Sequence, residues 1–251
     1  MNVQNERQDR ERSFWNSSYS ADMYAQWQEQ SYESWKNFRP LQRQALGFLG
    51  DIAGKRILFC GIGPEAVMFA RAGAQVYGFD ISDVQIAAVQ KLAERLDLAD
   101  QIVAAAMPFE ELEYETECFD AAYGHAILHH IDLPRGGTEL NRVLRKGAVA
   151  SFVEPLGMNP LLEFARRHLP YREKNRTADE KPLTYSDIAV FKRQFARGWH
   201  MEYCFLSMLR RRIITSRKVV KGLERIDERI LRWMPFLRRM CAEVWVGVQK
   251  I

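Results

Sequence analysis

The sequence predicts an α/β protein built on a largely parallel sheet, and three observations support this fold class. From Lys55 onward, short apolar segments of strand length alternate with helical segments, as in strands joined by crossover helices. Residues 148–153 (AVASFV) form a nearly continuous apolar run, which is typical of a strand covered on both faces. The chain has 251 residues, of which 47% are hydrophobic, enough for one sizeable core rather than two full domains.

The individual elements follow from changes in apolar spacing. Short apolar segments predict strands at residues 56–60, 75–79, 102–107, 119–124, 148–153, 203–208 and 242–249. Helical spacing predicts helices at residues 64–72, 84–96, 137–144, 161–168 and 184–196. Pro64 fits a first helical turn, and Ser82 or Asp83 can cap the next helix. Residues 1–12 are polar and are expected to form a frayed tail, whereas residues 13–50 are helical in composition and unusually aromatic.

Composition excludes several classes of protein. Charged residues make up 27% and aromatic residues 12%, which excludes a disordered or low-complexity chain. No run of 18 uncharged apolar residues is present, and the N-terminus lacks the apolar stretch of a secretory signal. The four cysteines are far apart and form no CxxC pair, so we expect no disulfide framework, no metal site and a cytoplasmic location.

A glycine loop follows the first predicted strand. Gly61 and Gly63 stand between that strand and a helix, where backbone can approach a ligand and unpaired N–H groups face it. Asp80 ends the second strand, 19 residues after Gly61, and a carboxylate there can accept hydrogen bonds from both hydroxyls of a ribose. This combination predicts a nucleotide-type cofactor. The run GIGPEA also satisfies the dinucleotide pattern, so a nicotinamide cofactor stays an alternative.

Several ordered motifs carry a resemblance to a known family. They are ILFCGIG (57–63), VYGFDIS (76–82), CFDAAYGHAILHHID (118–132), ELNRVLRKGAVASFVEP (139–155) and EPLGMNPLLEFARR (154–167). Together they resemble class I S-adenosylmethionine-dependent methyltransferases, in particular the branch of the ubiquinone and menaquinone biosynthesis enzymes. The resemblance implies a Rossmann-like, doubly wound, seven-stranded and mostly parallel sheet whose last strand is reversed. It also implies three regions: an N-terminal helical segment or lid (1–50), a donor-binding core (51–155) and an acceptor side (156–251).

The resemblance also implies a binding site for the methyl donor, S-adenosylmethionine. Gly61 and Gly63 would approach its methionine portion, and Asp80 would hold the ribose. Ile81 would pack on the adenine, and the far side of the ring would be lined by Met107, Pro108 and Phe109. His125, at the end of the fourth strand, would lie beside the methionine portion or the reacting methyl group.

The chain departs from the family pattern at the acidic anchors. Phe59 stands where the family usually has an acidic residue, and no acidic residue follows the third strand at Met107. The usual third small residue of the glycine loop is Glu65, which either contacts the amino group of the methionine moiety or faces solvent in the first turn of the helix.

Three of the five histidines fall within six residues, at His125, His129 and His130. Methyl transfer to oxygen or to an acidic carbon needs proton removal, and histidine does this near neutral pH. We expect His129 to be the base, with His130 as the alternative. In a helical turn their side chains would point about 100° apart, so only one would face the pocket. Glu154, at the end of the fifth strand, is expected to orient the acceptor or a histidine.

Two segments have open interpretations on the acceptor side. The aromatic N-terminal segment either packs on the sheet edge or forms a lid that turns Tyr19, Tyr24 or Trp27 toward the pocket. Asn159 is a candidate contact for the acceptor.

Residues 209–239 form a basic amphipathic insertion, with apolar positions Val219, Leu223, Ile226, Ile230, Met234 and Leu237. That stripe either packs on the domain or on a second copy, or it contacts an anionic membrane.

Charge distribution limits the partners. Residues 201–251 hold twelve Lys or Arg and five Asp or Glu, a net charge of +7, so the rest of the chain carries −3 of the total +4. No aromatic-interleaved basic motif supports nucleic acid. The resemblance implies a methyltransferase that acts on a small, hydrophobic molecule, and O- or C-methylation is favoured. The alternatives are an NAD-dependent oxidoreductase, a non-catalytic methyltransferase-like scaffold and a peripheral membrane protein.

Overall fold

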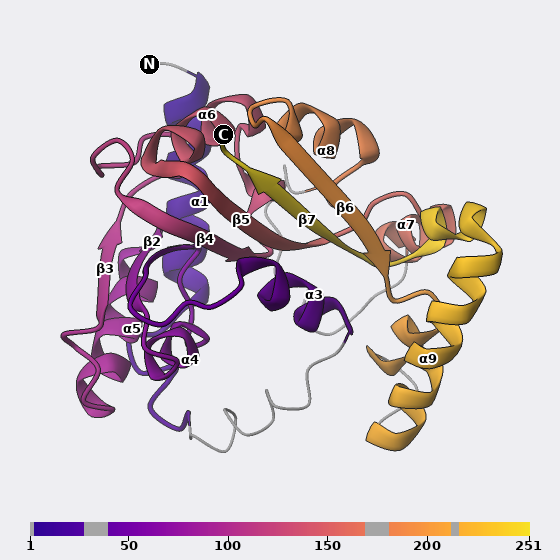
Figure 1. The fold of residues 1–251 in the computed structure, drawn as a ribbon. Coiled ribbons are helices and arrows are strands. Elements are labelled where there is room, and N and C mark those ends of the chain that lie inside the picture. Colours follow the sequence, from indigo (N-terminus) through magenta and orange to yellow (C-terminus); the bar gives the residue numbers. More distant parts are fainter. Residues whose placement is uncertain (1–2, 28–39, 169–180, 212–215) are drawn as a thin grey trace.

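The computed structural model describes residues 3–27, 40–168, 181–211 and 216–251 (Figure 1). A seven-stranded sheet with the order β3-β2-β1-β4-β5-β7-β6 forms its centre. The strands are β1 (Arg56–Cys60), β2 (Gln75–Asp80), β3 (Ile102–Ala106), β4 (Phe119–His125), β5 (Leu144–Pro155), β6 (Arg197–Tyr203) and β7 (Glu243–Gln249). β1 to β5 pair in parallel, and β7 runs antiparallel between β5 and β6. The predicted mostly parallel sheet with a reversed last strand is confirmed.

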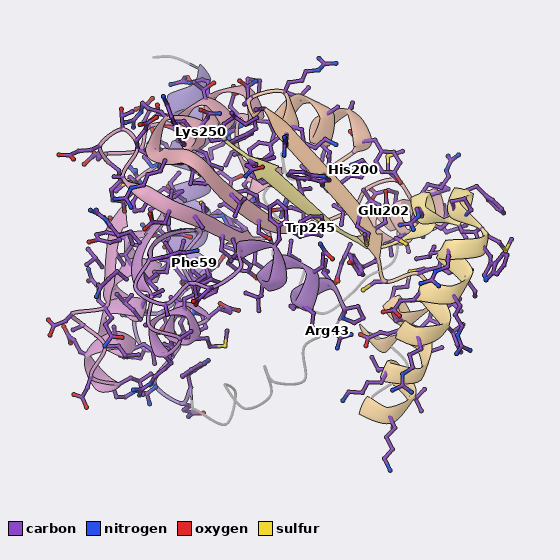
Figure 2. The ribbon with its side chains drawn as sticks, viewed as in Figure 1. Arg43, Phe59, His200, Glu202, Trp245 and Lys250 are labelled. Atoms are coloured by element: carbon purple, nitrogen blue, oxygen red, sulfur yellow. The ribbon has the colours of Figure 1, made fainter. Side chains whose placement is uncertain are left out.

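The sheet has a hydrophobic core on each face. Along β1, Ile57 and Phe59 belong to one core, and Leu58 and Cys60 belong to the other. This alternation follows from the two-residue period of a strand and explains why the strand is apolar throughout. The position expected to carry an acidic anchor, Phe59, is only 1% exposed and lies deep in the first of these cores (Figure 2).

Helices cover both faces of the sheet. They are α1 (Val3–Ser18), α3 (Pro40–Leu49), α4 (Ala66–Arg71), α5 (Asp83–Arg95), α6 (Leu133–Val143), α7 (Pro160–His168), α8 (Tyr185–Lys192) and α9 (Arg217–Trp233). Three short 3-10 helices follow β4, β6 and α9, namely η1 (Leu128–His130), η2 (Leu206–Arg211) and η3 (Pro235–Met240). In Figure 1, α3 crosses the near face of the sheet and α9 stands outside its β6 edge. None of the helices in the described ranges is long and apolar enough to cross a membrane.

The chain adds β2 and β3 on one side of β1 and then crosses to add β4 and β5 on the other side. In open α/β sheets such a switch point leaves a crevice outside the carboxyl ends of the strands, where ligands bind. The glycine loop after β1 and the histidines after β4 both lie at this point. The topology therefore brings together the two motifs that the sequence singled out.

The prediction of a frayed tail at residues 1–12 is wrong. Helix α1 begins at Val3, and its side chains bond to the rim of the crevice. Arg7 pairs with Glu110 at 2.6 Å, and the Arg12 Nε donates to the Ile81 carbonyl at 3.2 Å. These polar residues form an ordered helix because they bond to residues that lie 103 and 69 positions away, which local sequence does not show.

The predicted strand at residues 203–208 is displaced, because β6 covers Arg197–Tyr203 instead. The backbone N–H groups of Phe205, Leu206 and Ser207 donate to the carboxylate of Asp227, at 2.8 to 3.1 Å. These bonds fold the segment after β6 into η2 rather than into a strand. Asp227 thus acts as the anchor that joins α9 to the end of the sheet.

Candidate functional site

A cavity of about 300 Å³ lies at the carboxyl ends of β1, β2 and β4, beneath α1. Its floor and walls come from the sheet edge and from the segments after β3 and β4. Of the residues predicted for the site, those that line the cavity are Gly61, Asp80, Ile81, Met107, Phe109, His125, His129, His130 and Tyr19. The structure thus gathers into one cavity residues that span more than a hundred positions of the sequence.

The glycine loop turns sharply at Gly61, whose φ of +69° lies in the left-handed region that favours glycine. The N–H groups of Gly61 and Ile62 both donate to the Phe79 carbonyl at 2.9 Å, which ties the loop to β2. A Cβ atom at Gly61 would come within 3.3 Å of the Ile127 side chain. A side chain at this position would therefore narrow the cavity and strain the backbone.

Gly63 and Glu65 of the loop, and Phe59 of the preceding strand, are not among the residues that line the cavity. A Cβ atom at Gly63 would meet a carboxylate oxygen of Glu65 at 2.6 Å, so the Glu65 side chain folds back over Gly63. Phe59 packs edge-on against Phe69 and Tyr123, with ring centroids 5.3 and 5.2 Å apart. The residue that replaces the family's usual acid thus contributes to the core rather than to the cavity.

Asp80 brings a carboxylate to the cavity at the end of β2. Its Oδ1 accepts a hydrogen bond from the Ser82 N–H at 2.8 Å. Burial raises the pKa of Asp80 to about 6, although the backbone N–H groups of Ser82 and Ile81 oppose that shift. The carboxylate is therefore ionised at neutral pH, in a position to accept hydrogen bonds from ligand hydroxyls.

The side of the cavity predicted for adenine is largely apolar. Met107 and Phe109 are 4% and 3% exposed, and Phe109 meets Phe79 edge-to-face at 5.2 Å. The Met107 N–H donates to the Asp80 carbonyl at 3.0 Å, which fixes this wall relative to the carboxylate. Pro108 does not line this cavity but a shallow depression on the outer surface.

A buried histidine–glutamate pair lies at the end of β4. The Nδ1 atom of His129 is 2.7 Å from Oε2 of Glu154, and the two side chains are 4% and 0% exposed. The other oxygen of Glu154 accepts the N–H groups of Ile127 and Leu128, both at 2.9 Å. Burial raises the pKa of Glu154, but its hydrogen bonds with His129 and with these two N–H groups outweigh burial, and the net pKa is lowered. The ionised carboxylate favours a proton on Nδ1 of His129, and in that neutral tautomer Nε2 is the acceptor nitrogen.

Both histidines of η1 line the cavity, which corrects the expectation that only one would face it. The rings of His129 and His130 lie 4.1 Å apart and are tilted by 40°. Rotation about their side-chain bonds brings the rings together and offsets the angular separation of the backbone positions. Nδ1 of His130 is buried and has no hydrogen-bond partner among the described residues, and the nearest carboxylate, Glu11, is 3.5 Å away.

Helix α1 supplies three lining residues that sequence reasoning missed, Arg7, Glu11 and Trp15. Together with the predicted Tyr19 they line the cavity. They recur at intervals of four along α1 and its end, and this helical spacing was the signal available in the sequence. Trp15 stacks on Tyr19 at 5.3 Å, and its Nε1 donates to Glu11 at 3.0 Å. One face of the helix therefore forms the cover of the cavity.

Three predicted contact residues lie elsewhere. The Tyr24 hydroxyl bonds to the Gln85 side chain, and burial raises the pKa of Tyr24 to about 12. The Trp27 carbonyl accepts from Arg95 at 2.7 Å. Asn159 is 2% exposed, accepts the N–H groups of the first turn of α7, and donates to the Met240 carbonyl at 2.7 Å. These three residues do not line the cavity as the described residues form it; Tyr24 and Asn159 bond to neighbouring elements through their side chains, and Trp27 does so through its carbonyl.

Part of the chain is similar in sequence to known proteins. Residues 58–152 match the sequence model of the methyltransferase domain family. The chain is 33% identical over 124 residues to an S-adenosyl-L-methionine-dependent Diels-Alderase from Talaromyces variabilis, a match that covers 47% of this chain and 42% of that protein. It is 31% identical over 97 residues to the sterol 24-C-methyltransferase of Saccharomyces cerevisiae, which covers 38% of this chain and 25% of that protein. The chain thus spans less than half the length of these curated relatives.

A solved structure shares the fold. The geranyl diphosphate C-methyltransferase from Streptomyces coelicolor A3(2), crystallised with Mg²⁺, geranyl diphosphate and S-adenosyl-L-homocysteine, superposes with a TM-score of 0.57 at 14% identity, covering 83% of this chain and 79% of that one. The narrower resemblance to the ubiquinone-biosynthesis branch stays a prediction. Residues 58–152 therefore resemble a methyltransferase domain, and the fold of the chain is shared with a solved methyltransferase.

Proposed function

We propose that the protein transfers a methyl group from S-adenosylmethionine to a small, largely apolar acceptor, by O- or C-methylation. The observation that carries this proposal is the cavity beneath α1. It combines the glycine loop, the carboxylate of Asp80 and the buried His129–Glu154 pair at one edge of the sheet. When bound, S-adenosylmethionine supplies an electrophilic methyl group on a positively charged sulfur.

The residues present fit this donor. Gly61 leaves room for close approach of the backbone, and Asp80 offers a carboxylate to two ribose hydroxyls. The apolar wall of Met107 and Phe109 suits the adenine ring, with Ile81 opposite. His125, at the end of β4, lies on the side proposed for the methionine portion. The departures at Phe59 and Glu65 leave this set of contacts intact, because neither residue belongs to the described lining.

His129 is the proposed base. The carboxylate of Glu154 holds Nδ1–H of His129, so Nε2 can accept a proton from a hydroxyl or from an acidic carbon of the acceptor. As the new bond to the methyl carbon forms, the electron pair of the broken bond stays on the donor sulfur, and the acceptor proton moves to Nε2. His130, whose ring lies 4.1 Å from that of His129, is the alternative base.

Helix α1 is the proposed lid. Trp15 and Tyr19 cover the cavity, and Arg7 and Arg12 fasten the helix to its rim. Methyl transfer gains from the exclusion of water and from the alignment of nucleophile, methyl carbon and sulfur. A sterol and geranyl diphosphate, whose prenyl chain is apolar, are named for a sequence relative and a structural neighbour, and they support the choice of a largely apolar acceptor.

Titration calorimetry with S-adenosylhomocysteine tests the donor site. We expect micromolar binding to the unaltered protein. Asp80→Ala should weaken it by about 1–3 kcal/mol, or about 5- to 150-fold, through lost hydrogen bonds to a charged group. Asp100→Ala, an exposed carboxylate away from the cavity, is the matched control and should leave affinity unchanged. Unchanged affinity in Asp80→Ala would remove the ribose assignment. Binding of NAD instead would favour the oxidoreductase, and binding of neither would favour a scaffold.

A second candidate is a cyclisation that leaves the donor intact, which the relationship to the Diels-Alderase favours. The two candidates differ in whether S-adenosylhomocysteine is formed. Once an acceptor is found, stoichiometric release of S-adenosylhomocysteine with product supports methyl transfer. Product formed without that release supports cyclisation.

A further inference from the structure

Helix α9 presents an apolar stripe to solvent. Val219, Ile226 and Trp233 are 49%, 44% and 85% exposed, and they recur at intervals of seven residues, which places them on one line along the helix. The predicted stripe is therefore only partly packed. Leu231, on another side of α9, is the apolar residue that the helix buries, at 5% exposure.

The apolar surface continues beyond α9 onto two neighbouring elements. Phe236 in η3 is 64% exposed, and Leu161 in the first turn of α7 is 71% exposed. The hydrogen bond from Asn159 to the Met240 carbonyl joins the start of α7 to the end of η3, so these side chains belong to one region of the surface. In Figure 1 this region lies outside the β6 edge of the sheet. A cluster of large exposed apolar side chains is uncommon on a monomeric soluble domain and marks an interaction site.

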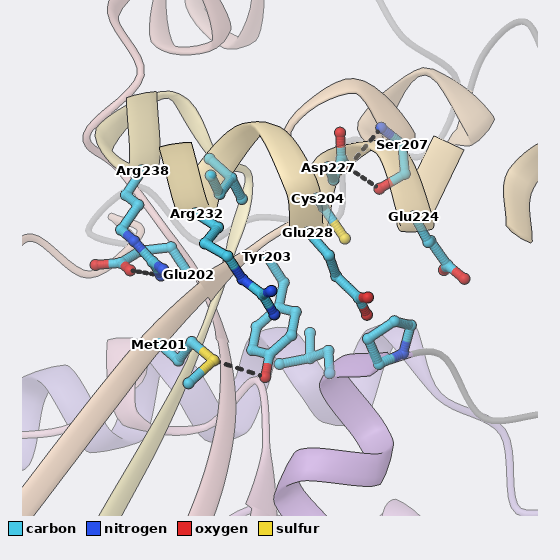
Figure 3. A pocket seen from close by; sticks show the side chains of 13 residues that line it. Met201, Glu202, Tyr203, Cys204, Ser207, Glu224, Asp227, Glu228, Arg232 and Arg238 are labelled. Carbon is cyan, nitrogen blue, oxygen red and sulfur yellow. Dashed lines mark hydrogen bonds and ion pairs between the residues drawn. The ribbon is translucent and has the colours of Figure 1, made fainter. Parts of the chain in front are cut away.

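The charged residues of α9 are divided between its two sides. The exposed basic residues are Lys218, Lys221, Arg225, Arg229 and Arg232. The acidic residues lie on the side of the helix nearer the sheet. Asp227 is buried against η2, and Glu224 and the exposed Glu228 line a cavity of about 270 Å³ between α9 and the end of β6, together with Arg232 (Figure 3). The outer surface of the helix is therefore positive, although the helix as a whole contains acids.

This division of side chains is typical of a helix that lies in a membrane interface. The apolar stripe enters the boundary between headgroups and acyl chains, Trp233 suits the headgroup level, and the basic flank meets anionic lipid. A second copy of the same helix is a poorer occupant, because it would bring its own basic flank against this one. Charge complementarity thus favours a negatively charged surface.

We propose that α9, together with η3 and the first turn of α7, docks the protein on anionic lipid bilayers with the helix parallel to the surface. β6 is antiparallel to β7 and so runs in the same direction as β4 and β5. The end of β6 that leads toward α9 therefore lies at the same sheet edge as the donor cavity. Docking would bring that edge of the sheet close to lipid-dissolved molecules.

Vesicle flotation with the full chain tests the proposal. Vesicles of phosphatidylcholine alone are compared with vesicles containing about 30% phosphatidylserine. We expect binding to the anionic vesicles only, and a steep loss of it as salt rises from about 50 to about 500 mM. Equal binding to both vesicle types, or absence of binding to the anionic vesicles at low salt, would overturn the proposal.

Paired variants locate the contact. Trp233→Ser combined with Phe236→Ser should weaken vesicle binding about tenfold or more, because two apolar side chains no longer leave water. Arg225→Glu combined with Arg229→Glu should weaken it further at low salt. Trp199→Ser and Lys146→Glu alter an exposed tryptophan and an exposed lysine elsewhere, and binding should persist in both. Unchanged melting temperatures would show that the variants fold, since all these positions are exposed.

The same variants distinguish membrane docking from an interface between two copies of the chain. If the stripe instead joins two copies of the chain, light scattering would show a dimer that Trp233→Ser dissociates, and lipid would not be needed. That result, or equal vesicle binding by the paired variants and the unaltered protein, would contradict membrane docking.

Discussion

Helices α1 and α9 are both rich in charged residues, yet they place them differently. Some charged side chains of α1 point toward the sheet, whereas most of those of α9 point toward solvent. α1 faces inward with Arg7 and Glu11, which reach the rim of the donor cavity. α9 buries Asp227 and Leu231 and leaves Trp233 and most of its basic residues in solvent. The two helices lie at different places along the sheet, α1 over the switch point and α9 outside the β6 edge (Figure 1).

The difference depends on what each helix finds beneath it. Below α1 lie charged and polar partners, including Glu110 and the Ile81 carbonyl, so its polar side chains are held. Below α9 lie three backbone N–H groups that need an acceptor, and Asp227 satisfies them. Buried polar groups must be paired, so the partners available decide which side chains turn inward. Amphipathic spacing alone predicts a stripe but not the direction in which it faces.

The largest effect should come from His129, at the cavity that α1 covers. His129→Ala should lower the single-turnover rate about 10²- to 10⁴-fold while donor affinity is kept, because the base is lost but the donor contacts remain. Glu154→Gln should shift the pH profile of turnover, since the charge that holds Nδ1–H is removed. His200→Ala, on β6, is the control. If all three cavity histidines can be replaced by Ala without loss of turnover, no base operates there.

A smaller effect, on stability, is expected at Asp80. Its pKa in the folded protein, about 6, lies above its unfolded value of about 3.9. The folded state therefore binds more protons between these values, and the free energy of unfolding falls as pH rises from about 4 to about 6. Asp80→Asn should raise stability by about 1–2 kcal/mol at pH 7.5 and leave it unchanged near pH 4.

Donor affinity should depend on the ionisation of Asp80 in the opposite sense to stability, because the ionised form binds the donor better. Affinity of the unaltered protein for S-adenosylhomocysteine should fall below about pH 6, because a protonated Asp80 accepts fewer hydrogen bonds. The Asp80→Asn variant should bind S-adenosylhomocysteine weakly at every pH. Denaturant unfolding and calorimetry at several pH values check both statements, with Asp100→Asn as the control. A variant that is destabilised at pH 7.5 would show that ionised Asp80 is favourably placed even without donor.

The smallest effect should come from loosening α1. Glu110 is 5% exposed and accepts from Arg7 at 2.6 Å and from the Asp132 N–H at 2.8 Å. Glu110→Gln should raise hydrogen exchange in α1 and weaken donor binding about 3- to 10-fold, because a buried pair loses its charge. Asp22→Asn breaks an ion pair with Lys91 whose side chains are 76% and 57% exposed, and it should change neither. Equal exchange in both variants would show that α1 is held by its aromatic contacts alone.

Much of the fold was predictable because its strands carry strong local signals. β1 begins and ends where the apolar run RILFC does, and the prediction for residues 242–249 differs from β7 by one residue. Helix α5 begins after Ser82, whose side chain accepts from the Gln85 N–H as expected of a cap. These features depend on neighbours in sequence, and periodicity reports them directly.

The site was predictable only where its residues end strands. Asp80, His129 and Glu154 could be placed at one edge because parallel strands deliver their carboxyl ends together. The contributions of Glu11 and Trp15 could not, because their partners, such as His130, lie more than a hundred positions away. The stacking of the two histidine rings depends on side-chain rotation, which no spacing rule describes.

The carboxylate of Glu110 also has a consequence for the order in which the protein assembles during synthesis. α1 is translated before its partners, because Glu110 and His130 leave the ribosome more than a hundred residues later. The N-terminal helix must therefore wait undocked while β1 to β4 form beneath it. Until residues as far as His130 have been synthesised, the contacts of α1 with the rim of the cavity cannot form, so the cover of the cavity is a late contact in the assembly of the domain.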